Sequence, residues 1–350
     1  MPLGVLQTRD GEAPGTVILL DKENRSAAFN FKHAHGKNSD VVLVPQPSND
    51  PNDPLNWPRW KKDLTLAVVF LNTIILASVP APILAPATVL LTTVFHVSLD
   101  KIAVLSGYQL LLVGCIGPVV SALARKYGKR PQFVFAGIMG IIGTAVCLSA
   151  NTDYNTLMAG RLLQGFGTTA FESLSIAVVG DMYFVHERPV RTGAITLTLT
   201  CVASLVSIIG GPITANLGWQ YMFIIHLPFT IIGALAIIFF LPETQFVRIS
   251  GGQRIGTLPT SLEENSITSK VAQSEQLEDT ASTDAKPQFS DSKAVSGSHP
   301  IPRKSYISSL ALFSGTYTDE NIFKLLLTPL AVLLNPAVIW VSDRIRNDRL

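Results

Sequence analysis

The most informative feature of the sequence is a series of long, nearly uncharged hydrophobic runs. Six of them follow one another, at about 64–84, 102–123, 133–150, 157–179, 193–215 and 222–241. Each has about the 20 residues that an α-helix needs to cross about 30 Å of hydrocarbon. The strict alternation of a membrane β-strand is absent, and a helix is the only single segment that satisfies its own backbone in lipid. The pattern predicts an all-α membrane protein with six transmembrane helices.

Composition supports this prediction and excludes other classes. The 350 residues are 47% hydrophobic and only 15% charged, whereas soluble domains average about 25% charged. A compact soluble enzyme is therefore excluded, and no HExxH, GxSxG or P-loop motif is present. The net charge is only +2, and the basic residues lie in short clusters rather than in one broad patch, which gives no indication of nucleic-acid binding. The three cysteines lie in apolar runs without metal-binding spacing, so we expect no metal site and no disulfide framework.

Basic residues in the connections indicate the orientation. One side of the bilayer would receive the basic clusters at 59–62, 125–130 and 188–191 together with Arg248, and the other side would receive only Lys101. Because cytoplasmic loops carry an excess of Lys and Arg, both ends of the six-helix block are expected in the cytoplasm. We expect a multi-pass protein of the plasma membrane.

Polar segments flank the predicted six-helix domain, 64–244. Residues 1–63 are expected to form a cytoplasmic tail that ends in an interfacial anchor, Trp57 and Trp60. Residues 245–322 are rich in Ser, Thr, Gln and acidic residues and have few apolar ones. Such a segment cannot bury enough surface to offset its chain entropy, so it is predicted to be a disordered cytoplasmic linker.

The last segment, 323–350, combines a seventh apolar run with a polar tail. The run, 325–341, contains Asn335-Pro336 and ends at a tail with three arginines. A full crossing would export those arginines, which the positive-inside bias opposes. We therefore expect a partial seventh helix and an aberrant tail, in a chain that is truncated at its C-terminus.

Two ionisable residues lie within the fourth run. Arg161 and Glu172 are eleven positions apart, which returns to within about 20° of the same helix face. Gly165, Thr168 and Ser175 lie on the same stripe. A stripe of this kind facing lipid is implausible, so it is expected to line a cavity or to pack against another polar helix. A structural ion pair within the bundle and a role in a transport pathway both remain open, and the second suits a carboxylate that carries a proton.

Single polar residues occur in other runs. They are Asn72, Tyr108, Gln109 and His226, and for each an interhelical hydrogen bond and a ligand contact remain open. Small residues recur in the fifth run, where Ser207 and Gly211 precede Pro212. Such faces are more often close helix contacts than substrate sites, and the Gly210-Gly211-Pro212 sequence also permits a bend.

Four local patterns together resemble one family. The stretch 121–131, SALARKYGKRP, resembles the GxLaDrxGRrp signature between helices two and three of major facilitator superfamily transporters. The stretch 161–167, RLLQGFG, is similar to the helix-four motif RxxQGxG of that superfamily, and 207–212, SIIGGP, is similar to the gxxxGP antiporter motif. The edges of the sixth run, GWQYMF at 218–223 and LPET at 241–244, also resemble the family. The residues around Glu172 resemble a fungal subgroup of drug or cation:proton antiporters.

The resemblance implies twelve helices in two halves that alternate access to a central cavity. It implies that Arg161 takes part in proton coupling and that Lys129 and Asp181 form a cytoplasmic latch. The positions assigned to proton coupling or the cavity are Arg161, Glu172, Gln164, Thr168, Asn72, Tyr108 and Gln109. Those assigned to the latch are Arg125, Lys126, Gly128, Lys129, Arg130 and Asp181, and those of the helix-five motif are Ser207, Gly211 and Pro212. Arg125 and Ser121 depart from the loop signature, where the family has an acidic residue and a glycine, and Ala215 and Asn216 replace the last two glycines of the helix-five motif.

The expected function is therefore secondary transport of small organic molecules such as drugs, toxins or organic cations. A proton gradient would supply the energy, so no cofactor is expected, and the partners would be the substrate, the bilayer and a missing C-terminal half. Because substrate sites in this architecture lie between the two halves, we expect the chain alone not to transport. The alternative is a truncated membrane protein that does not transport but pairs with or modulates a full-length transporter.

Overall fold

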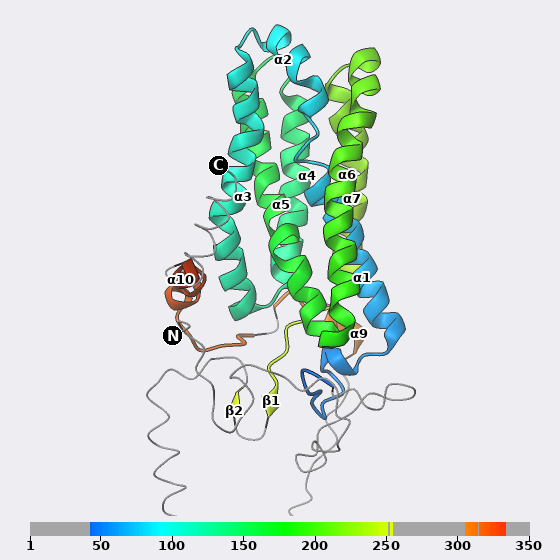
Figure 1. Cartoon of the computed structure of the whole chain (residues 1–350), viewed down its shortest axis with the longest axis vertical. Helices are drawn as coiled ribbons and strands as arrows, with labels where there is room; N and C mark the ends of the chain where they lie inside the picture. The colour runs from blue at the N-terminus through cyan, green and yellow to red at the C-terminus, as the bar shows by residue number, and fades with distance from the viewer. Residues whose placement is uncertain (1–42, 251–252, 255–304, 314, 334–350) are drawn as a thin grey trace, which may run out of the picture.

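The computed structural model describes residues 43–250, 253–254, 305–313 and 315–333, and its described part is a bundle of helices. The long helices α3 (Leu99–Tyr127), α4 (Arg130–Ser149), α5 (Tyr154–Met182), α6 (Arg188–Leu217) and α7 (Gln220–Phe240) run side by side (Figure 1). These five are long and apolar enough to cross a membrane by length and composition, α6 together with the short helix η5 (Val185–Glu187). They match five of the six predicted spans. We call the end of the bundle that carries the 3₁₀ helix η2 (Pro54–Asn56) and the α3–α4 connection the basic end; it is the lower end in Figure 1.

The first predicted span, 64–84, is wrong as one continuous helix. Helix α1 (Arg59–Thr73) is followed by a π-helical turn, η3 (Ile74–Ser78), after which the chain forms turns. Pro80 and Pro82 explain the break, because a proline inside a helix lacks the backbone N–H and clashes with the preceding turn. Both prolines lie inside the predicted span 64–84. Two short helices that the hydrophobic pattern did not predict follow them, η4 (Ala85–Ala87) and α2 (Thr88–Phe95).

Helices α4 and α5 form the tightest contact because glycines face each other there. A Cβ atom on Gly160 would lie 2.7 Å from the Cys147 backbone nitrogen, and one on Gly167 would lie 2.8 Å from that of Gly140. Small residues let helix backbones approach closely in membrane proteins. Above and below this contact lie two apolar clusters, one toward the basic end around Phe171 and one toward the other end.

Local sequence explains where several helices begin and end. Asp153 caps α5, since its carboxylate accepts hydrogen bonds from the backbone N–H groups of Asn155 and Thr156 at 3.1 and 3.3 Å. Helices α3 and α6 both end at a glycine with positive φ, Gly128 at 98° and Gly218 at 101°. Helix α6 is continuous through Pro212, so the bend that the sequence permits is not a break.

The described residues at the two ends of the predicted linker, 245–322, include regular secondary structure. Strands β1 (Ile249–Ser250) and β2 (Gln253–Arg254) form a two-residue antiparallel pair, and helix α9 (Tyr306–Ser309) begins a segment that crosses the basic end. We call residues 305–313 and 315–321 the strap. Two backbone hydrogen bonds hold the strap on the bundle. The Glu243 N–H after α7 donates to the Ser309 carbonyl at 3.3 Å, and the Tyr317 N–H donates to the Lys126 carbonyl at the end of α3 at 2.9 Å.

Helix α10 (Ile322–Leu333) follows the strap and packs against α3. Its start agrees with the predicted seventh apolar run, and residues 334–350, which include the predicted polar tail, lie outside the described residues. Residues 1–42 and 255–304 also lie outside them.

Candidate functional site

A buried polar cluster in the middle of the bundle surrounds Arg161 of α5. The Arg161 side chain is fully buried, and its Nη1 donates hydrogen bonds to the Pro80 carbonyl at 2.7 Å and to Gln164 Oε1 at 2.9 Å. Its Nη2 donates to the Ala81 carbonyl at 3.3 Å. Gln164 in turn donates to Thr144 Oγ1 of α4 at 3.0 Å. The partners of Arg161 are therefore Gln164 and backbone carbonyls just after the broken first helix. The negative end of the helix dipole also stabilises a cation at this place.

The same cluster satisfies the carbonyls that the break in α1 leaves without donors. In the π-helical turn the Ile75 carbonyl would accept from residue 80, but Pro80 has no N–H. His226 Nε2 of α7 bonds that carbonyl at 2.8 Å, and Thr168 Oγ1 of α5 donates to the Leu76 carbonyl at 2.9 Å. Of the two interpretations left open for His226, the structure favours the interhelical hydrogen bond.

Glu172 does not join this cluster, although it lies on the same predicted stripe of α5 as Arg161. Thr168 lies about 20° from Arg161 around the helix toward α1, whereas Glu172 lies about 20° the other way. On that side Gly165 faces α3, with its Cβ position 3.1 Å from the Gln109 carbonyl oxygen. The Glu172 side chain is exposed, whereas Arg161 is fully buried against the Pro80 and Ala81 carbonyls after α1.

Three of the other predicted cavity residues also lie outside the Arg161 cluster. Asn72 is buried and its amide donates to the Val68 carbonyl at 2.9 Å. Gln109 is buried, and neither polar atom of its side chain has a hydrogen-bond partner among the described residues. Tyr108 is 42% exposed on α3. Only Arg161, Gln164 and Thr168 thus form one connected cluster.

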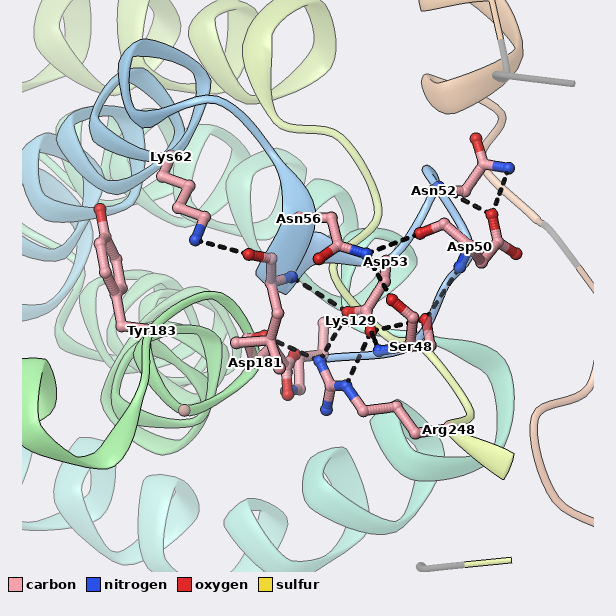
Figure 2. A network of polar contacts seen from close by, with 12 residues as sticks. Ser48, Asp50, Asn52, Asp53, Asn56, Lys62, Lys129, Asp181, Tyr183 and Arg248 are labelled. Atoms are coloured by element: carbon pink, nitrogen blue, oxygen red, sulfur yellow. Dashed lines mark hydrogen bonds and ion pairs between the residues drawn. The ribbon is translucent and has the colours of Figure 1, made fainter. Parts of the chain in front are cut away.

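A second polar network lies at the basic end and contains the predicted latch pair (Figure 2). Lys129 Nζ forms an ion pair with Asp181 Oδ2 and donates to the Ala177 carbonyl at 3.1 Å. Both side chains are largely buried, with 8% and 22% of their surface exposed. The pair connects the start of α4 to the end of α5, so the structure brings together the two residues that the resemblance assigns to the latch.

Glu243, which sequence analysis did not single out, caps α4 from the end of α7. Its two oxygens accept hydrogen bonds from the backbone N–H groups of Lys129 and Arg130, both at 3.1 Å. A carboxylate is stabilised at this position by the helix dipole. Burial raises the pKa of Glu243, and its backbone donors and Lys129 oppose this effect only in part. A Cβ atom on Gly128 would collide with Glu243 Oε2, and this glycine also has a positive φ of 98°.

Asp53 and Arg248 extend this network, and neither was predicted as a site residue. Asp53 is fully buried; its Oδ1 lies 3.0 Å from Arg248 Nη2, which also donates to the Asp181 carbonyl at 3.1 Å (Figure 2). Burial would raise the pKa of Asp53, but hydrogen bonds from Arg248 and from the backbone N–H groups of Leu55 and Ser48 hold it below its usual value. The segment before α1 is thereby fastened to the end of α5.

Comparison with known proteins decides the family. The sequence model of the Major Facilitator Superfamily matches residues 65–341, most of the chain. The chain belongs to the major facilitator superfamily. It is therefore an integral, multi-pass membrane protein of a transporter family.

Its relatives are longer than this chain. An uncharacterized MFS-type transporter of Schizosaccharomyces pombe is 28% identical over 243 residues, which cover 69% of this chain and 41% of that protein. The MFS-type transporter TOXA of Cochliobolus carbonum is 31% identical over 181 residues, 51% of this chain and 32% of the relative. Multidrug resistance protein 3 of Bacillus subtilis is 28% identical over 144 residues, 41% of this chain and 27% of the relative. The chain thus spans less than half the length of these relatives.

The remaining predicted site residues lie outside both polar clusters or at their edge. Lys126 donates to the Glu320 carbonyl of the strap at 3.3 Å, and Arg130 donates to the Leu241 carbonyl at 2.7 Å. Arg125 is exposed at the end of α3. In the helix-five motif, Ser207 is half-buried, Pro212 is exposed and the Cβ position of Gly211 meets open space.

Close packing at the helix-five motif depends instead on the preceding glycine. A Cβ atom on Gly210 would lie 2.7 Å from Pro86 of η4. The motif therefore positions the segment after the α1 break. Among the described residues, no three His, Cys, Asp or Glu side chains lie close enough together to hold a metal ion.

Proposed function

We propose that this chain is the N-terminal six-helix part of a proton-coupled secondary transporter of small organic molecules, of the fungal drug or organic-cation type. The family assignment supports transport, and the names of two relatives, a TOXA transporter and a multidrug resistance protein, support substrates of this kind. The basic loops favour a cytoplasmic N-terminus, and we propose the plasma membrane as its location.

The observation that carries the proposal is the position of Glu172. A carboxylate near the middle of a membrane helix is costly unless it meets water or a partner. Glu172 is exposed on the described bundle, and only 22% of the most apolar stretch of the neighbouring helix α3 is buried. In transporters built from two six-helix parts, substrate and coupling-ion sites lie between those parts near the bilayer midplane. This exposed position supports the proposal that Glu172 binds and releases a proton at such a surface.

The two polar clusters would then have different duties. Protonation of Glu172 would neutralise a charge at the surface between the halves and bias inward-facing against outward-facing states. Arg161, with its carbonyl partners, would keep the broken end of α1 in place beside that surface and set a positive potential. The ion pair between Lys129 and Asp181 would stabilise one of the two states at the basic end.

The experiment uses proteoliposomes in which the chain is reconstituted alone or together with the C-terminal half of a homologous transporter. Uptake of a fluorescent organic cation is measured under an imposed pH gradient. We expect gradient-driven uptake with both halves present, and Glu172→Gln should abolish its dependence on the gradient. Asp100→Asn, at the exposed start of α3, is the matched control and should leave uptake unchanged.

Two outcomes would contradict this proposal. If Glu172→Gln left the pH dependence intact, Glu172 would not be the coupling group. If no preparation transported, while the chain co-purified with a complete homologue and altered its rate, the chain would be a modulator of a transporter.

A further inference from the structure

A cavity of about 340 Å³ opens at the basic end, apart from the Arg161 cluster and next to the basic-end network, whose Glu243 lines it. Three segments form its wall: the residues around the start of α1, the end of α7 and the strap. Its volume lies at the lower end of the range for small-molecule sites. Because it lies where the membrane-spanning helices end, we expect its mouth to lie near the headgroups of the bilayer.

Aromatic side chains from all three segments line the cavity. Trp57 and Trp60 come from the first, Phe240 from α7 and Tyr306 from the strap. Trp60 and Tyr306 are 69% and 54% exposed. The Tyr306 hydroxyl donates to the Phe239 carbonyl at 2.5 Å, which anchors its ring. The faces of aromatic rings attract cations. The Trp57 ring already makes such a contact, because Lys61 Nζ lies 3.9 Å from its centre.

The cavity also has one group of each charge. Lys61 supplies an ammonium group and Glu243 a carboxylate. A purely anionic ligand would meet Glu243, and a purely cationic one would meet Lys61. A zwitterion of modest size matches both charges together.

We propose that this cavity binds the phosphocholine headgroup of a membrane lipid. The quaternary ammonium group lies against the aromatic faces on the side of Glu243, and the phosphate lies toward Lys61. Aromatic faces favour a quaternary ammonium group because it is weakly hydrated and needs no hydrogen-bond acceptor, whereas the primary ammonium of ethanolamine loses hydrogen bonds there. Since the wall comes from three segments, the bound lipid fastens the strap to the bundle. The proposal does not depend on transport.

The test measures binding of short-chain lipids to the full chain in maltoside detergent by titration calorimetry. The probes are dihexanoyl phosphocholine, phosphoethanolamine and phosphoglycerol below their micelle concentrations, together with choline chloride. We expect phosphocholine to bind at least about fivefold more tightly than each of the others, as one additional cation–aromatic contact would give. Equal affinity for phosphoethanolamine would overturn the aromatic assignment, and equal affinity for choline would overturn the lipid assignment.

Variants in the strap separate ring recognition from strap docking. Tyr306→Leu should weaken phosphocholine binding about three- to tenfold, whereas Tyr306→Phe, which keeps the ring, should retain most of it. Phe313→Leu is the matched control, because Phe313 is an exposed strap aromatic that packs against Tyr127 outside the cavity. Equal losses in Tyr306→Leu and Phe313→Leu would overturn the proposal. If Tyr306→Leu did not fold, Trp60→Leu would replace it, since Trp60 is mostly exposed and should show the same loss.

Discussion

The two polar clusters of this bundle are built from different interactions. In the middle, Arg161, Thr168 and His226 bond backbone carbonyls of the broken first helix. At the basic end, Lys129 pairs with Asp181, and Arg248 with Asp53. The first cluster completes a backbone that cannot satisfy itself in lipid, and the second joins side chains on separate segments.

This difference indicates which cluster can change state. Separating Arg161 from its carbonyls would leave several buried polar groups without partners, each costing about 1–3 kcal/mol. The Lys129–Asp181 pair keeps part of its side-chain surface exposed, 8% and 22%, whereas Arg161 has none, so water reaches the charges of the opened pair more readily. We therefore infer that the middle cluster is permanent and that the basic end can open and close.

The largest expected effect is in the middle cluster. Arg161→Met removes the donors of the Pro80 and Ala81 carbonyls and should lower the free energy of unfolding by about 3–5 kcal/mol. Unfolding by dodecyl sulfate in mixed micelles measures it. Arg125→Met, at an exposed position, is the control and should change it by less than about 0.5 kcal/mol. Similar values for the two variants would refute a structural role of the middle cluster.

The next effect concerns the joint between α3 and α4. Gly128→Ala should cost about 2–3 kcal/mol, because the residue has a positive φ and its Cβ would collide with Glu243. Gly218→Ala has nearly the same φ but meets open space, so it should cost only the backbone strain, about 1–2 kcal/mol. The difference between the two unfolding free energies isolates the collision. It should shrink when Gly128→Ala is combined with Glu243→Ala, and an unchanged difference would place the strain elsewhere.

Hydrophobic patterning predicted five of the long helices well, because a run of about 20 apolar residues has few alternatives in lipid. It failed at Pro80 and Pro82, since a proline inside an apolar run does not reduce hydrophobicity even where it ends a helix. It also does not separate Glu172 from Arg161. A helical wheel places a residue on a face to within tens of degrees, but the neighbours α1 and α3 divide that face.

Of the basic-end network, the sequence predicted only the residues that correspond to positions of the family resemblance. Lys129 and Asp181 were paired through the family resemblance. Arg248 and Asp53 are 195 positions apart and lie in segments without periodic structure, so no local pattern relates them. Glu243 was noticed only as the edge of a helix, because capping of a different helix is a property of the folded chain.

A smaller effect should follow from opening the latch pair. Lys129→Gln and Asp181→Asn should each lower the unfolding free energy by about 1–2 kcal/mol, because the pair is largely buried. In a double-mutant cycle the coupling energy should be about 1 kcal/mol. A coupling energy near zero would show that the pair contributes nothing to the closed basic end. The same cycle for Lys324 and Glu320, a pair on α10 and the strap whose lysine side chain is 65% exposed, is the control and should give less than about 0.5 kcal/mol.

The smallest effects are in the pH dependence, where two carboxylates of one network should act in opposite directions. The pKa of Asp53 is lowered from 3.8, so its contribution to stability is present above that value and is lost as pH falls through the folded-state pKa. The pKa of Glu243 is raised from 4.5, so its contribution is present below that value and is lost as pH rises through the folded-state pKa. Each slope is at most about 1.4 kcal/mol per pH unit.

The measurement is the unfolding free energy of each variant from pH 3 upward. In Asp53→Asn the fall in stability on the acid side should disappear, and in Glu243→Gln the fall above pH 4.5 should disappear. If both variants changed the same limb, the two groups would titrate as one unit, and the basic end would respond to protons at a single site.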